Sequence, residues 1–203
     1  MTLQGVTYQG PTLETPEKLA KLPSDLIEIL WQVNGFVAYA GGLHVRGMTD
    51  EPEWHSLERY WSGEMALHEI YRDVQPYDAP FGQDFLGNQF LLRDRNVFRL
   101  RADTGEVRPL DMDLAHFLEA CREDPVEFLG LHLLAEFHQS QGMLEPGQLI
   151  HTMPPLCVVD SDAKVSMRAV PADNALSFLA NFARQVQDLP DGAEINLRLF
   201  TPE

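Results

Sequence analysis

The chain has 203 residues, of which 44% are hydrophobic, and its 31 acidic and 15 basic side chains give a formal net charge of −16. This length and apolar content favour one folded domain, or one domain with an extension, and exclude a chain that is disordered throughout. The acidic surplus disfavours binding to nucleic acid or anionic membranes, and we expect neither a membrane span nor a secretory signal because the sequence lacks the required apolar runs.

The amino-terminal part of the chain predicts helices. Residues 15–17, Thr-Pro-Glu, are typical of a helix start. Residues 24–33 carry apolar side chains at spacings of three and four and are followed by Asn34-Gly35, which predicts a helix with a left-handed end. Trp31 belongs to this apolar stripe, so we expect its side chain in the core.

Two short strands and a broken helix are predicted next. Residues 36–39 and 43–47 read as strands separated by a glycine pair. Residues 53–71 have a helical pattern that Gly63 is expected to break, and two prolines and an aspartate between 74 and 80 indicate a loop.

The central stretch, residues 79–107, has the most regular pattern in the chain. Apolar and polar residues alternate over 88–92 and 97–102, which predicts two strands of an antiparallel meander with one buried and one wet face. Turn residues at 93–96 and 103–105 separate these strands and a third short one. The glycines of PFGQDFLGNQ match no phosphate-binding loop, so we interpret them as sites of tight backbone geometry.

The last part of the chain mixes helices and strands. Asp113 and Pro125 predict the starts of helices over 113–122 and 125–138. Consecutive central strands indicate an α+β fold, with a mainly antiparallel central sheet flanked by helices. The tail predicts a buried strand over 156–159, a polar turn over 160–163, a strand over 165–170, a helix over 172–187 and a final strand over 193–200.

No catalytic or metal-binding set emerges from the motifs. His132, Glu136 and His138 lack the spacing of a zinc site, because His138 is turned away from His132 on a helix. Cys121 lies among apolar neighbours and is expected in the core. Cys121 and Cys157 are far apart and form no CxxC pair, which favours a reducing, cytoplasmic location. We therefore predict a protein that is not an enzyme and has no cofactor.

Charge is unevenly distributed along the chain. Residues 81–110 carry five basic and four acidic side chains, so the acid surplus lies elsewhere. A basic strip at positions 93, 95, 99 and 101 is interpreted as a solvated strand face. Acids are densest in two clusters, Asp50-Glu51-Glu53 beside Trp54, and Glu119-Glu123-Asp124-Glu127, where Asp124 has the position of a helix cap before Pro125.

An ordered set of short motifs runs along the chain, made of Leu22-Pro23, Asn34-Gly35, Phe85, Gly87, Phe90 and Thr104-Gly105-Glu106. This set resembles the SUKH superfamily, which includes bacterial immunity proteins for polymorphic toxins and fungal cell-wall regulators. Leu189-Pro190-Asp191-Gly192 resembles a turn of a bacterial subgroup, whereas residues 155–160 depart from that subgroup's glycine pair. The resemblance implies a SUKH-like domain over 1–140 and a carboxy-terminal α/β extension over 141–203, packed on the same domain.

The resemblance also implies a function in protein binding, most directly as an immunity-like protein that neutralises a partner toxin by contact. The alternative is a regulatory or adaptor protein that binds an endogenous partner or a small ligand. Because toxins that attack nucleic acids present basic surfaces, we expect a basic partner docked on Asp50, Glu51 and Glu53, with Trp54 as a buried anchor. The acidic charge could also serve solubility alone.

Overall fold

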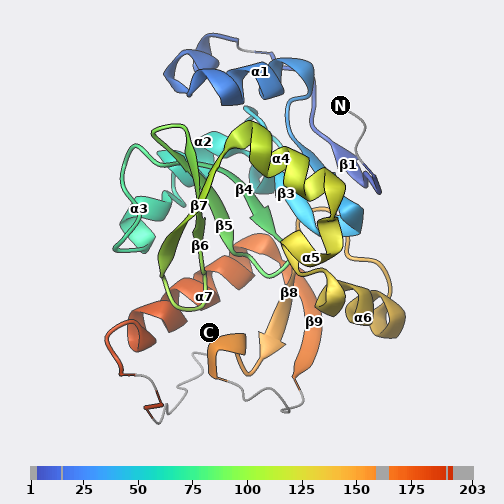
Figure 1. Ribbon diagram of the computed structural model, residues 1–203, viewed down its shortest axis with the longest axis vertical. Coiled ribbons are helices and arrows are strands. Elements are labelled where there is room, and N and C mark those ends of the chain that lie inside the picture. The colour runs from blue at the N-terminus through green and yellow to red at the C-terminus, as the bar shows by residue number, and fades with distance from the viewer. Residues whose placement is uncertain (1–3, 15, 159–164, 191, 194–203) are drawn as a thin grey trace.

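A computed structural model describes residues 4–14, 16–158, 165–190 and 192–193. Within these residues, seven strands form one sheet in which each strand pairs antiparallel with the next along the chain (Figure 1). This arrangement confirms the predicted α+β fold with an antiparallel central sheet. The strands are β1 Tyr8–Gln9, β2 Phe36–Ala38, β3 Leu43–Val45, β4 Ala79–Asp84, β5 Gln89–Arg93, β6 Asn96–Leu100 and β7 Val107–Asp113.

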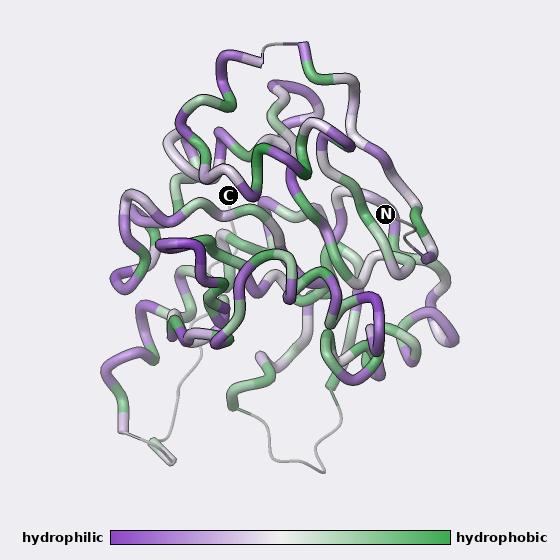
Figure 2. The backbone as a smooth tube through the Cα atoms, turned by 45° about the horizontal axis from the view of Figure 1, so that its top comes forward, coloured by the Kyte–Doolittle hydropathy of each residue, from purple (hydrophilic) through white to green (hydrophobic). Residues whose placement is uncertain are grey.

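Helices cover both faces of the sheet. One core cluster joins α1 and α4–α6 to the sheet, and a second joins α3 and α7 to its other face, while α2 contributes Leu57 to the first cluster and Tyr60 to the second. Hydrophilic segments lie mainly on the outer helices and loops (Figure 2). The helices are α1 Ser24–Gln32, α2 Leu57–Trp61, α3 Leu67–Ile70, α4 Leu114–Glu123, α5 Pro125–Leu129, α6 His132–Gln141 and α7 Ala172–Val186.

The β5–β6 hairpin confirms the strands expected over 88–92 and 97–102 to within two residues. Arg93 pairs with Asn96 at its end, and the intervening Asp94 and Arg95 have φ angles of 47° and 70°. This two-residue turn matches the twist of an antiparallel pair. The expected wet face was wrong, because Leu91 and Leu100 are also buried, in the cluster that contains α7.

Strand β4 lies where we predicted the end of a loop and a stretch of tight backbone, and every residue in it is buried. A Cβ at Gly82 would lie 2.7 Å from the carbonyl oxygen of His44 on the neighbouring strand. Gly87 closes the β4–β5 connection with a φ of 88°, in the left-handed region. These two positions support the structural interpretation of the glycines in this stretch.

The basic strip is solvated only in part: the side chains of Arg95 and Arg101 are 75% and 44% exposed, whereas Arg93 and Arg99 bind buried acids. Arg93 donates from Nε and Nη2 to both carboxylate oxygens of buried Asp78, each over 2.7 Å. Arg99 donates to Asp84 Oδ2 over 2.8 Å, and that carboxylate also accepts from the backbone and side chain of Asn88. The two arginines therefore hold buried acids that belong to the strands and loops beside them.

The helical predictions before the sheet were correct in part. Helix α1 and strands β2 and β3 are confirmed, and the broken helix over 53–71 appears as a 3₁₀ turn, α2 and α3. Residues 16–21 form a 3₁₀ turn, while Thr15 lies outside the described residues. The expectation for Trp31 was wrong: it is 59% exposed, because Leu26 and Leu30 define the buried face of α1 and Trp31 projects about 100° away from Leu30.

The helical predictions after the sheet were also partly correct. Asp113 caps α4 by accepting from the backbone N–H of His116, as expected. The single helix expected over 125–138 is wrong, because Gly130 adopts a left-handed conformation and separates α5 from α6. Helix α7 confirms the helix predicted over 172–187.

The tail contains a hairpin of β8 Gln148–Met153 and β9 Ser166–Pro171, of which only β9 was predicted. The strand expected over 156–159 is wrong in its described part, because residues 156–158 form a half-buried 3₁₀ turn after Pro154 and Pro155. The predicted turn over 160–163 and all but the first residue of the strand over 193–200 lie outside the described residues.

Candidate functional site

The acidic loop, residues 49–53, connects β3 to the 3₁₀ turn before α2. Asp50, Glu51 and Glu53 all lie on the surface, and the side chains of Asp50 and Glu53 are 81% and 63% exposed. The structure therefore brings the three acids predicted as partner contacts together on one exposed segment.

Buried backbone contacts hold both ends of the acidic loop. Asn34, which is 5% exposed, donates from Nδ2 to the carbonyl of Met48 and accepts from the Met48 backbone N–H at 2.7 Å. At the other end, the backbone N–H of Gly47 donates to the carbonyl of His55 over 3.0 Å. Fixed ends reduce the backbone entropy that a partner would have to remove, whereas the exposed acidic side chains keep their own rotamer entropy.

Two buried histidines lie under the loop. His44 Nε2 and His55 Nδ1 are 2.8 Å apart, and His55 Nε2 lies 3.0 Å from the carbonyl of Asn34. Burial lowers the pKa of His55 to about 4 and holds the pKa of His44 well below its ordinary value. Both rings are therefore neutral at pH 7, and this hydrogen-bond order assigns a proton to Nε2 of each ring.

Trp54 is placed differently from the three acids. Its ring is half-buried and lies 4.8 Å from the ring of Tyr8, 5.2 Å from His44 and 5.4 Å from His55, measured between centroids. A Cβ at Gly147 would lie 2.9 Å from the indole. Trp54 thus fastens the acidic loop to β1 and β3, and part of its ring remains exposed.

Two cations partly neutralise the loop. Lys18 Nζ lies 2.8 Å from Asp50 and 3.0 Å from Glu58, and these partners, Asp50 first, raise the Lys18 pKa. Arg59 pairs with Glu53. Among the described residues, Glu51 has no ion pair. The local balance is six carboxylates for two cations, the acids being Asp50, Glu51, Glu53, Glu58, Glu64 and Asp173.

A series of ion pairs and polar contacts connects the acidic loop to the core. Arg59, the partner of Glu53, also lies 3.0 Å from Asp173 on α7. Tyr60 donates its hydroxyl to Asp173 over 2.5 Å, and the buried Arg46 guanidinium lies 4.0 Å from the centre of the Tyr60 ring. The acidic loop, α2 and α7 are therefore joined by alternating charges.

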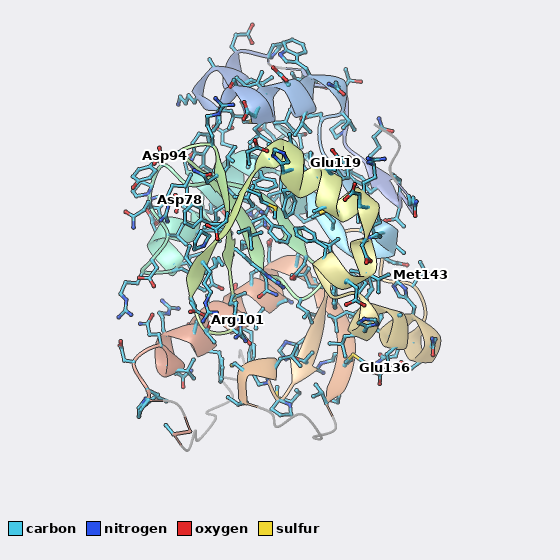
Figure 3. All side chains as sticks on the ribbon, in the orientation of Figure 1. Asp78, Asp94, Arg101, Glu119, Glu136 and Met143 are labelled. Carbon is cyan, nitrogen blue, oxygen red and sulfur yellow. The ribbon has the colours of Figure 1, made fainter. Side chains whose placement is uncertain are left out.

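The second acidic cluster lies on α4 and α5. Asp124 accepts from the backbone N–H of Glu127 over 3.2 Å, which confirms its interpretation as a helix cap. Glu119 pairs with Arg122 at 2.5 Å, and Glu127 lies 3.1 Å from His132. Figure 3 shows Glu119 on the outer surface of α4. This cluster contributes to its own helices, as the cap position indicated.

The possible catalytic and metal-binding side chains of the sequence have clear surroundings in the structure. Cys121 is 1% exposed, which confirms its core position, and burial raises its pKa to about 12, so it is a neutral thiol. Among the described residues, no three His, Cys, Asp or Glu side chains are grouped to hold a metal ion. Nor does any helix in the described part of the chain combine the length and apolar character of a membrane span.

The sequence patterns did not reveal the residues that hold the acidic loop in place, nor a cavity elsewhere in the fold. Asn34 was predicted only as part of a helix end, and His44 and His55 were not singled out. A cavity of about 450 Å³ lies where β6 and β7 meet β8, with Arg99, Arg101 and Arg108 on its wall. The one available signal was the local excess of basic residues over 81–110.

Comparisons with known proteins address the fold alone. No protein-family model matches the chain, and no curated protein matches it. The structure is similar to the crystal structure of Atu4351 from Agrobacterium tumefaciens, with a TM-score of 0.56 and 10% sequence identity over 88% of this chain and 85% of that one. At this identity, the likeness extends to the architecture and carries no function.

Proposed function

We propose that this chain is a non-enzymatic, immunity-like protein that neutralises a partner toxin by direct contact, through the acidic loop. The observation that carries the proposal is a surplus of exposed carboxylates on a loop whose ends are fixed by buried contacts. A fixed acidic surface is suited to a basic partner, because complementary charge speeds encounter and favours the correct orientation.

The three acids have different roles in this proposal. Glu51 makes the first contact with a partner cation, because among the described residues no base pairs with it. Asp50 and Glu53 exchange Lys18 and Arg59 for cations of the partner, which fixes the register of docking. Trp54 positions the loop from below, and its exposed part lies against the partner at the centre of the contact.

The protein acts in the cytoplasm in this proposal, consistent with two free cysteines, and it does not bind nucleic acid itself, because its net charge of −16 repels phosphates. The alternative function is that of a regulator or adaptor with an endogenous partner or a small ligand. The cavity beside β8 favours the small-ligand form of that alternative.

The test compares two variants that lose the same charge. The loop variant combines Asp50→Asn, Glu51→Gln and Glu53→Gln, and the matched control combines Glu119→Gln, Glu123→Gln and Glu127→Gln. Each tagged protein is used to capture partners from the source cell, and the captured protein is identified and assayed for toxicity with and without the wild-type chain.

The proposal predicts that the wild-type and control chains capture a basic protein and suppress its toxicity, whereas the loop variant captures at least about tenfold less of it. Equal capture by the loop variant would refute the docking site. Capture of a partner with no toxic activity would refute the immunity function and leave the adaptor function.

A further inference from the structure

The cavity beside β8 has one polar and one apolar wall. Its volume is about 450 Å³, within the range of small-molecule sites. The apolar wall is formed by side chains from the β4–β5 connection, β7, β8, the following 3₁₀ turn and α7. These residues are Leu86, Leu110, Ile150, Leu156 and Leu179.

Three arginines gather on the polar wall. Arg99 on β6 and Arg108 on β7 are direct cross-strand partners, and both line the cavity together with Arg101. Like charges directly opposite each other destabilise a sheet, and here Asp84 and Glu106 offset part of the repulsion between Arg99 and Arg108, while the carboxylate of Asp103 also lines this wall. Figure 3 shows Arg101 at the end of the main sheet nearest α7.

The arginines retain unused donors. Among the described residues, each donates a single side-chain hydrogen bond to a carboxylate: Arg99 to Asp84, Arg101 to Asp103 and Arg108 to Glu106, over 2.8, 3.1 and 2.5 Å. A guanidinium has five N–H groups, so most donors on this wall remain available. Buried Arg99 Nε and Asp103 Oδ1 have no hydrogen-bond partner in the described part of the chain.

We propose that this cavity binds a small amphipathic anion, whose carboxylate or phosphate head contacts Arg101 and Arg108 and whose apolar body lies against Leu110, Ile150 and Leu179. Guanidinium groups bind both kinds of head in a bidentate manner, and an apolar body removes the leucine-rich wall from water. Thr152 also lines the cavity and supplies a neutral hydrogen-bonding group for a second polar atom of the ligand, whereas the Asn88 amide, also on the wall, already bonds Asp84 and the backbone N–H of Ala102.

The experiment measures binding of four probes to the full chain by calorimetry and by amide NMR shifts. Octyl phosphate and octanoate carry both a charged head and an apolar body, whereas octanol lacks the charge and inorganic phosphate lacks the apolar body. We expect one of the two anions to bind saturably at one per chain, at least about tenfold more tightly than octanol or inorganic phosphate. The shifts should centre on 150–152 and 176–180, and the tighter anion identifies the head group.

Matched variants test the arginines. Arg101→Gln with Arg108→Gln should weaken binding of the tighter anion by about tenfold or more, because two charge-assisted contacts are lost. Arg95→Gln with Arg122→Gln removes the same charge from exposed positions and should change binding by less than about twofold. Absence of saturable binding by both anions, or equal binding by both double variants, would overturn the proposal. The result is independent of any protein partner, because none of the probes is a protein.

Discussion

The carboxylates of the central sheet and those of the acidic loop have opposite surroundings. Asp78 and Asp84 are each 1% exposed, and Arg93 and Arg99 bind them from the neighbouring hairpin. Asp50, Glu51 and Glu53 lie in water. Asp50 and Glu53 share their cations, Lys18 and Arg59, with other acids, and Glu51 has no ion pair among the described residues. The comparison shows that position in the fold, and not charge alone, decides whether an acid holds the structure together or is available to a partner.

The same comparison explains the uneven charge along the sequence. Residues 81–110 are nearly neutral because their arginines balance acids inside and beside the segment. Most of the acid surplus therefore lies outside the central hairpin, and part of it lies on the acidic loop, whose ends have buried support.

The largest effect should follow from removing a buried acid. Asp84→Ala leaves Arg99 without its partner and the backbone N–H groups of Leu86 and Asn88 without an acceptor, and should cost about 3–5 kcal/mol of unfolding free energy. Urea denaturation measures this, with Glu51→Gln as the control, for which the change should stay within about 0.5 kcal/mol. If both variants lost similar amounts of unfolding free energy, the acids of the sheet and those of the loop would not differ in structural role as described.

A second effect concerns pH and the buried support of the loop. The folded pKa of His55, about 4, lies below its unfolded value of 6.5, so between these pH values the unfolded chain binds more protons. Stability should therefore fall as pH decreases through this window, by about 2–3 kcal/mol for this group between pH ~7.5 and pH ~4.5. His44, shifted in the same direction, adds to the loss.

Urea denaturation at both pH values measures this loss, and His55→Asn should reduce the pH dependence. If the variant keeps the full wild-type dependence, other groups are responsible and the neutral histidine pair does not support the loop as described.

Local patterns in the sequence predicted the parts of the fold that local forces determine. The β5–β6 hairpin, the caps at Asp113 and Asp124 and helix α7 follow from alternation, side-chain acceptors and helical spacing. Strands β4 and β8 were missed because their sequences do not alternate clearly. Their strand conformation depends on pairing with β3, β5 and β9.

For the candidate site, the sequence could predict the acidic residues but not the contacts that hold them in place. The density of acidic residues in the sequence located Asp50, Glu51 and Glu53. The hydrogen bonds that hold Met48 come from Asn34, 14 residues away in the sequence, and no local pattern indicates them. Trp31 was assigned to the core from the width of an apolar stripe, and only the direction in which α1 packs shows that it is exposed. Tertiary contacts thus decided both outcomes.

A smaller effect should sharpen the role of Lys18. Lys18→Gln frees Asp50 and Glu58 and should raise the association rate with a basic partner by about two- to fivefold at low salt. Its effect on stability should stay within about 1 kcal/mol, because the pairs are on the surface. Stopped-flow association measures the rate, and a slower rate would show that Lys18 holds the loop in its docking geometry.

The smallest effect is expected at the exposed face of α1. Trp31→Ala should change unfolding free energy by less than about 1 kcal/mol, since the side chain is 59% exposed, whereas Phe117→Ala in the core should cost about 3–5 kcal/mol. Denaturation of both variants under the same conditions checks the difference. A cost for Trp31→Ala near that of Phe117→Ala would contradict the exposed position.

The central claim is that the acidic loop docks a basic partner, and the association rate across a salt series tests it most directly. The captured partner is mixed with the wild-type chain and with the triple variant at Asp50, Glu51 and Glu53, from about 50 mM to about 500 mM salt. The account predicts a wild-type rate that falls at least about tenfold over this range, and a triple variant that is slower at low salt and falls less steeply with salt. A wild-type rate that does not change with salt, or a triple variant that matches it throughout, would contradict the claim.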